Sequence, residues 1–197
     1  MRPFLSLFSF RKLPFNRALR ILLFTNAAIL IAAAMFGPIY ALFVEKIGGN
    51  LMDASIASGI FAFVAGLTTI ISGRYSDRIK ENELVVVLGY LIIGIGFLLY
   101  LRVDSVIFLF IVEGIIGIGE AIYSPAFDAL YSKHLDGRKS GLQWGAWEST
   151  NYFTAAAGAV VGGGLVTMFG FQFLFIVMAV LCFGSALYIL RLKRWTL

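Results

Sequence analysis

Three glutamates interrupt stretches of sequence that otherwise carry almost no charge: Glu113, Glu120 and Glu148. Glu113 and Glu120 are seven residues apart, which on an α-helix places them within about 20° of the same direction, so both can face one cavity. If these stretches cross a membrane, an ionised carboxylate costs ~2.5 to 3.5 kcal/mol near the centre of the bilayer. No Lys or Arg lies within the stretches to neutralise them. We therefore predict that the glutamates are protonated, contact water or bind a cation, which is the chemistry of a proton-responsive site.

Two asparagines in apolar sequence, Asn26 and Asn151, are predicted to line the same cavity. A structural role is the competing interpretation, because a protonated glutamate can donate a hydrogen bond to a neighbouring helix. Glu148 is the strongest case for that role, since Ala155 and Gly162 share its helix face. Both interpretations stay open for the glutamates.

The composition of the chain is that of an integral membrane protein, with 60% hydrophobic and 14% charged residues and a mean hydropathy of +0.90. Its one cysteine, Cys182, excludes a disulfide framework and any multi-cysteine metal site. The one histidine, His134, falls in a polar segment without an assignable nucleophile, so we predict no enzymatic activity and no cofactor. The net charge of +5 comes from basic residues that border apolar runs, which argues against nucleic-acid binding.

The apolar runs predict six transmembrane helices, because each is about long enough at ~1.5 Å per residue to cross a ~30 Å hydrocarbon layer. Their predicted ranges are 21–44, 54–73, 84–101, 105–127, 141–169 and 171–190, with a turn at Gly170. Residues 1–20 are predicted to lie on the cytoplasmic membrane surface, and residues 191–197 form a tail. The third helix, with Tyr90 and Tyr100, shows no evident chemistry and is predicted to face lipid over much of its surface.

The distribution of basic residues predicts how these helices are oriented. Fourteen Lys and Arg fall in the termini and in the connections after the second and fourth helices, against two, Lys46 and Arg102, in the other connections. Positively charged loops are retained on the cytoplasmic side. We therefore predict a multi-pass protein of the cell membrane with both termini in the cytoplasm.

Prolines and glycines predict how the helices are shaped and packed. Pro38 and Pro125 are expected to break the first and fourth helices, which are equivalent members of two three-helix inverted repeats. Gly59, Gly66 and Gly73 form a stripe on the second helix that can admit a neighbouring helix. The fifth helix carries a similar close-packing pair, Gly158 and Gly162.

Several motifs follow in the order found in one transporter family. The loop after the second helix reads Gly73-x-x-x-Asp77-Arg78, the fourth helix reads Gly117-Ile118-Gly119-Glu120-Ala121 with Pro125 after it, and the sixth begins Gly170-Phe171-Gln172-Phe173-Leu174-Phe175. Together they resemble the N-terminal six-helix half of a major facilitator superfamily transporter over about residues 18 to 194. Glu113 stands where this family often has an arginine, and the Gly-Pro pair of its antiporters is missing from the fifth helix.

The resemblance implies alternating-access transport of a small solute, with the lipid membrane around the helices. Protons are a second expected partner because of the three glutamates. Because the family uses two six-helix halves around one site, it implies a homodimer or a second half from elsewhere. Gly73, Asp77 and Arg78 would form its gating motif, with Asp77 near the helix start at Ser140 to Gln143 of the other half. A local pairing of Asp77 with an arginine is the alternative.

Two other functions fit a six-helix membrane protein. The chain can be the substrate-capture subunit of an ATP-driven importer, or a scaffold that does not transport. An intramembrane protease is excluded because no Gly-x-Ser-Gly helix is present, and no phosphate-binding loop of the Walker type occurs.

Overall fold

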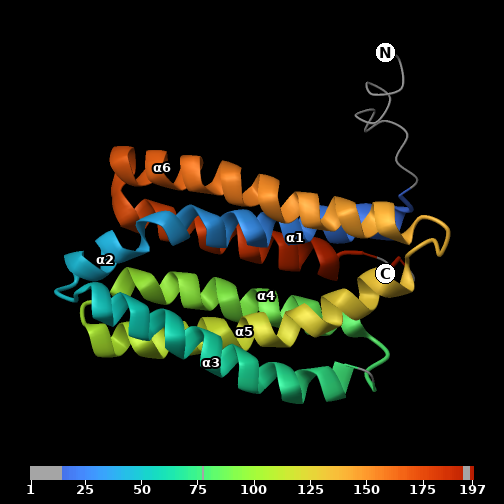
Figure 1. The fold of residues 1–197 in the computed structure, drawn as a ribbon, viewed down its shortest axis with the longest axis horizontal. Coiled ribbons are helices and arrows are strands. Elements are labelled where there is room, and N and C mark those ends of the chain that lie inside the picture. Colours follow the sequence, from blue (N-terminus) through green and yellow to red (C-terminus); the bar gives the residue numbers. More distant parts are fainter. Residues whose placement is uncertain (1–14, 77, 193–195) are drawn as a thin grey trace, which may run out of the picture.

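The computed structural model describes residues 15–76, 78–192 and 196–197, and within these ranges the regular structure is entirely helical (Figure 1). In chain order the elements are α1 (Arg17–Phe36), the 3₁₀ turn η2 (Gly37–Ile39), α2 (Tyr40–Lys46), α3 (Leu51–Ser76), α4 (Asn82–Leu99), the 3₁₀ turn η3 (Tyr100–Arg102), α5 (Val106–Lys133) and α6 (Ser140–Leu190).

Five helical segments among the described residues are long and apolar enough to cross a membrane: 17–46, 51–76, 82–102, 106–133 and 140–190. The last has 51 residues, which at ~1.5 Å per residue is more than twice the thickness of the hydrocarbon layer. Gly170 interrupts it with φ 81° and ψ 173°, a conformation that glycine adopts without steric cost. The chain turns back there, so the arms 140–169 and 171–190 run in opposite directions (Figure 1). The predicted turn at Gly170 is confirmed.

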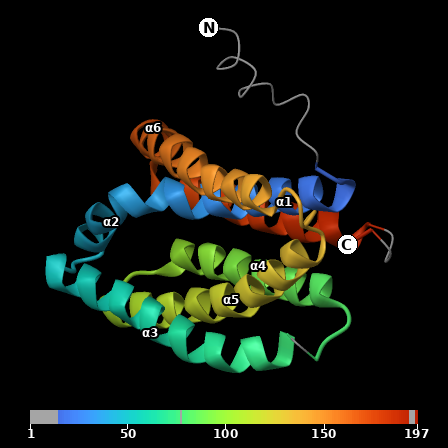
Figure 2. The same cartoon turned by 45° about the vertical axis from the view of Figure 1, so that its right-hand side comes forward.

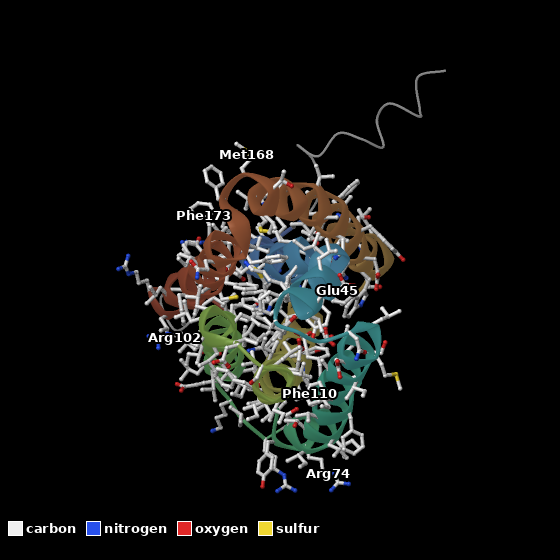
Figure 3. All side chains as sticks on the ribbon, turned by 90° about the vertical axis from the view of Figure 1, so that its left-hand side faces the viewer. Glu45, Arg74, Arg102, Phe110, Met168 and Phe173 are labelled. Carbon is white, nitrogen blue, oxygen red and sulfur yellow. The ribbon has the colours of Figure 1, made fainter. Side chains whose placement is uncertain are left out.

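The helices pack as two groups. α1 lies against α6, while α3 and α4 both lie against α5, and contacts between α4 and α6 join the groups (Figure 2). Seen along the helices, α6 with Met168 lies at one side of the bundle and α3 with Arg74 at the other (Figure 3). The α2 end of the bundle, which carries Lys46 and Arg102, is called the Lys46 end below.

Glycines allow the backbones of α6 and α1 to approach closely. A Cβ atom on Gly158 would collide with Ala34, and one on Gly162 would collide with the backbone of Met35. The close packing predicted for this pair is confirmed, and its neighbour is α1 of the same chain. Gly59, Gly66 and Gly73 differ, because no atom lies within 4 Å of a Cβ built on them. The glycine stripe of α3 therefore has no neighbour among the described residues.

The two membrane-embedded prolines have different effects on their helices. Pro38 lies in the η2 turn that separates α1 from α2, so the break predicted there is confirmed. The break predicted at Pro125 is wrong, because α5 runs unbroken from Val106 to Lys133. Proline removes the hydrogen bond to the carbonyl group four residues earlier, here that of Ala121. Ser72 of α3 donates a hydrogen bond to this carbonyl oxygen, which compensates for the missing N–H.

Several helix ends differ from the predicted ranges. α3 ends at Ser76 and α4 begins at Asn82, so the connection between them is shorter than the predicted loop. α5 continues to Lys133, six residues past its predicted end at Phe127. Residues 17–20, predicted to lie on the membrane surface, belong to α1, and residues 1–14 fall outside the described part. Polar residues at the helix ends lie outside the apolar layer, but their backbone still makes helical hydrogen bonds. The helices are therefore longer than the apolar runs.

Candidate functional site

Glu113 is buried in the bundle, with 6% of its surface exposed. The hydroxyl group of Tyr100 donates a hydrogen bond to Glu113 Oε1 over 2.6 Å. The hydroxyl group of Tyr40 lies close to the same carboxyl group, yet makes no hydrogen bond of standard geometry with the described residues. A carboxyl group thus sits between two phenol groups in apolar surroundings. It can accept a hydrogen bond from a phenol whether it is neutral or ionised.

The pairing of Glu113 with Tyr100 follows from the contact of α4 with α5. A Cβ atom on Gly96 would collide with the side chain of Ile116, so the two helices pack closely at this level. Tyr100 lies four residues beyond Gly96 and Glu113 lies three residues before Ile116, spacings that keep each residue on the same helix face. In this antiparallel pair of helices, both side chains therefore reach the same point one turn nearer the Lys46 end.

A cavity of about 310 Å³ lies beside Glu113 and is called the Glu113 cavity. Glu120, about two turns further along α5, also lines it, so the structure brings these two glutamates to one space. The remaining lining is mainly aliphatic and aromatic: Ile29, Ala33, Phe36, Gly37, Tyr40, Ser58, Phe61, Ile93, Phe97, Tyr100, Ile116 and Met178. No Lys, Arg or His is among these lining residues. The wall therefore offers carboxyl groups and aromatic rings to a ligand.

A second group of polar side chains extends from Glu120 to Asn26. Tyr123 donates a hydrogen bond to Glu120 Oε1 over 3.1 Å, and its ring packs edge-on against that of Tyr90, with centroids 5.0 Å apart. The hydroxyl group of Tyr90 in turn donates to Asn26 Oδ1 over 3.4 Å. Asn26 and Tyr90 are buried. α1, α4 and α5 are thus joined through polar groups in the middle of the bundle.

The interpretation of the third predicted helix was wrong for its tyrosines. Tyr90 and Tyr100 are buried and make hydrogen bonds. The contact of Tyr123 with Glu120 could have been predicted from sequence, because Tyr123 follows Glu120 by three residues and so shares its helix face. The contact of Tyr100 with Glu113 could not have been predicted in this way, because it depends on how α4 and α5 are aligned.

The profile described as Major Facilitator Superfamily matches residues 22–195 of the sequence. The chain belongs to the Major Facilitator Superfamily. It is therefore a multi-pass membrane protein of a transporter family and not an enzyme.

Two curated facilitator proteins illustrate the similarity. The chain is 27% identical over 176 residues to the Multidrug resistance protein MdtG of Klebsiella pneumoniae (strain 342), covering 86% of this chain and 42% of that protein. It is 25% identical over 162 residues to the Uncharacterized MFS-type transporter YitZ of Bacillus subtilis (strain 168), covering 81% of this chain and 97% of that protein. The chain thus spans less than half the length of MdtG and nearly the whole length of YitZ.

The other site residues predicted for a facilitator are not brought to the Glu113 cavity. Glu148 is exposed on the first arm of α6 and is not among the residues that line this cavity. Asn151, three residues further along, is half-buried.

The predicted gating motif lies at the end of the bundle opposite Lys46. Gly73 is in the last turns of α3, and Arg78 is exposed in the connection to α4. Asp77 lies outside the described residues. The role of the motif therefore stays a prediction.

Proposed function

We propose that this chain is one lobe of a facilitator that moves a small solute across the membrane by alternating access, coupled to protons. The observation that carries the proposal is the Glu113 cavity, a space of about 310 Å³ in which Glu113 and Glu120 meet a largely apolar and aromatic wall. An ionisable residue inside a transmembrane bundle is expensive to keep and is characteristic of ion and proton pathways.

The chemistry of the cavity favours a cationic or neutral organic solute over an anion. An anion placed there would meet two carboxyl groups without a basic side chain among the lining residues. Aromatic faces such as those of Phe36 and Phe61 attract organic cations. A solute of this kind also agrees with the multidrug resistance named for the MdtG relative.

The proposal includes a topology of six crossings, obtained when the two arms of α6 are counted separately. The proposal also includes the two three-helix inverted repeats. It places both termini in the cytoplasm, because basic residues concentrate at the end opposite Lys46. The Lys46 end would then face the outside of the cell.

A second six-helix lobe, from another copy or another chain, would complete the transport pathway. The exposed glycine stripe of α3 supports this, because small residues on an exposed helix face suit contact with another helix. Asp77 would approach the start of α6 in that second lobe, where the positive end of a helix attracts a carboxylate.

Reconstituted vesicles test the proposal with ethidium as the solute, an organic monocation with a flat aromatic body. An imposed pH gradient should drive ethidium movement by the wild type, and Glu113→Gln and Glu120→Gln should each reduce the coupled proton movement. We expect a loss of about tenfold or more, because a fixed neutral amide cannot exchange the proton.

The matched control is Glu45→Gln, which removes a carboxylate from the exposed end of α2 (Figure 3). It should transport like the wild type. If both cavity variants retain full solute-driven proton movement, these carboxyl groups do not couple the two.

A further inference from the structure

A second cavity opens near the Lys46 end of the bundle. Its volume is about 370 Å³, and we call it the Lys46 cavity. Its polar lining comes from Lys46, Asp104 and Gln172, which are exposed. Charged side chains at a helix end lie in the watery part of a membrane. The Lys46 cavity is thus a recess that water and its protons can enter from this face of the protein.

Tyr100 separates this recess from the buried carboxyl group. Among the described residues, Tyr100 alone lines both the Lys46 cavity and the Glu113 cavity. Its side chain is 4% exposed, and its hydroxyl group is hydrogen-bonded to Glu113. The recess and the Glu113 cavity therefore meet at this residue.

Aromatic neighbours hold the ring of Tyr100 in place. It stacks on Phe175 with centroids 4.9 Å apart, and it packs edge-on against Phe36 at 5.0 Å and Phe43 at 5.8 Å. Aromatic pairs with these geometries stabilise the packing beyond the burial of the rings. These four rings, which come from α1, α2, η3 and the second arm of α6, form an apolar partition that we call the aromatic seal.

The backbone at Tyr100 differs from that of the helix before it. α4 ends at Leu99, and Tyr100 begins the 3₁₀ turn η3. A 3₁₀ turn has poorer hydrogen-bond geometry than an α-helix and often ends one. The residue that closes the route is thus placed at the junction of a rigid helix and a short turn.

We propose that Tyr100 controls access from the Lys46 cavity to Glu113. When the ring lies in the aromatic seal, the carboxyl group is cut off from that cavity and is held by the phenol. When the ring swings out, the hydrogen bond to Glu113 breaks, the two cavities join, and water carries protons to and from the carboxyl group. This makes Tyr100 a positioning residue for proton exchange, whether or not the proposed transport occurs.

Carboxyl labelling tests the proposal without any transport measurement. The chain is placed in lipid nanodiscs and treated with a water-soluble carbodiimide and an amine, and mass spectrometry quantifies modified Glu113 and Asp136. Asp136 is the internal reference because it is exposed in the connection between α5 and α6 and lines neither cavity. The measured quantity is the ratio of Glu113 to Asp136 labelling.

Tyr100→Ala should raise this ratio by about tenfold, because the open form changes from a minor state to the main one. Tyr100→Phe keeps the ring and should stay within about twofold of the wild type. An unchanged ratio in Tyr100→Ala would overturn the proposal.

A plug in the Lys46 cavity tests the route without altering the seal. Lys46→Cys is coupled to a bulky maleimide, and Met52→Cys, exposed on α3 outside this cavity, is the matched control. Cys182 is buried and can be left in place. The plug at residue 46 should lower the ratio in the wild-type background and reverse the rise in Tyr100→Ala. Equal ratios with the plug at residue 46 and at residue 52 would show that Glu113 is reached by another route.

Discussion

At the scale of single residues, Ser72 supplies a hydrogen bond that the proline in α5 removes. Pro125 leaves the carbonyl group of Ala121 without its usual helical partner, and the Ser72 hydroxyl group of α3 binds it instead. Ser72→Ala should therefore lower the free energy of unfolding by ~0.6 to 1.7 kcal/mol, which are the average and the largest value measured for side-chain hydrogen bonds between membrane helices. Titration with a denaturing detergent measures this change.

The control for Ser72 is Thr69→Ala, one turn earlier on α3. The Thr69 hydroxyl group donates to Ala65 of its own helix, whose carbonyl group keeps its helical N–H partner. A smaller loss is expected there. Pro125→Ala restores the N–H group, so Ser72→Ala should cost less in that background. Equal losses in both backgrounds would show that Ser72 acts in another way.

The chemistry of the glutamates was predictable from sequence, while their partners were not. The seven-residue spacing of Glu113 and Glu120 was enough to predict a shared direction. The hydrogen bond from Tyr100 depends on the alignment of α4 with α5, which the close contact of Gly96 with Ile116 sets. Nothing in the sequence around Glu148 revealed that this side chain is exposed on the first arm of α6.

At the scale of elements, the contact between α6 and α1 depends on Gly162. An added Cβ atom would collide with the Met35 carbonyl group, and backbone cannot yield as a side chain can. Gly162→Ala should therefore destabilise the protein by ~1 to 3 kcal/mol through overpacking. Thermal unfolding in detergent micelles measures the effect.

Gly163 is the matched control for this substitution. A Cβ atom there meets nothing within 4 Å, so Gly163→Ala should be neutral or stabilise the helix by up to ~1 kcal/mol. A similar loss for the two variants would contradict the packing that we describe.

Apolar runs predicted where helices occur, because their length and composition suit the hydrocarbon layer. They did not predict helix ends, since Asn82 and Lys133 extend helices into polar surroundings. The rule that proline breaks a helix holds at Pro38 and fails at Pro125. Nothing in the sequence near Pro125 reveals that Ser72 will satisfy the carbonyl group of Ala121.

At the scale of the whole molecule, the exposed faces of α3 and of the first arm of α6 should contact a second lobe. Single cysteines replacing Phe63 on α3 or Val160 on α6 are exposed positions for cross-linking. We expect them to yield a product of two chains when this 197-residue chain is expressed in membranes. Gel electrophoresis reads out the product.

Leu88→Cys on α4 and Val180→Cys on the second arm of α6 are the controls, because they are also exposed. In the proposed assembly they face lipid and should give little product. Cross-linking at these two positions alone would mean that the lobes meet through a different face.

Proton release during solute binding tests the central proposal most directly. Ethidium is added to the detergent-purified chain in a weakly buffered solution that contains a pH indicator. The wild type should release about one proton per ethidium bound, since a buried neutral carboxyl group must ionise to pair with a cation. Glu113→Gln should still take up the dye weakly but release far less. Binding without proton release by the wild type, or release at the wild-type level by both Glu113→Gln and Glu120→Gln, would contradict coupling in the Glu113 cavity.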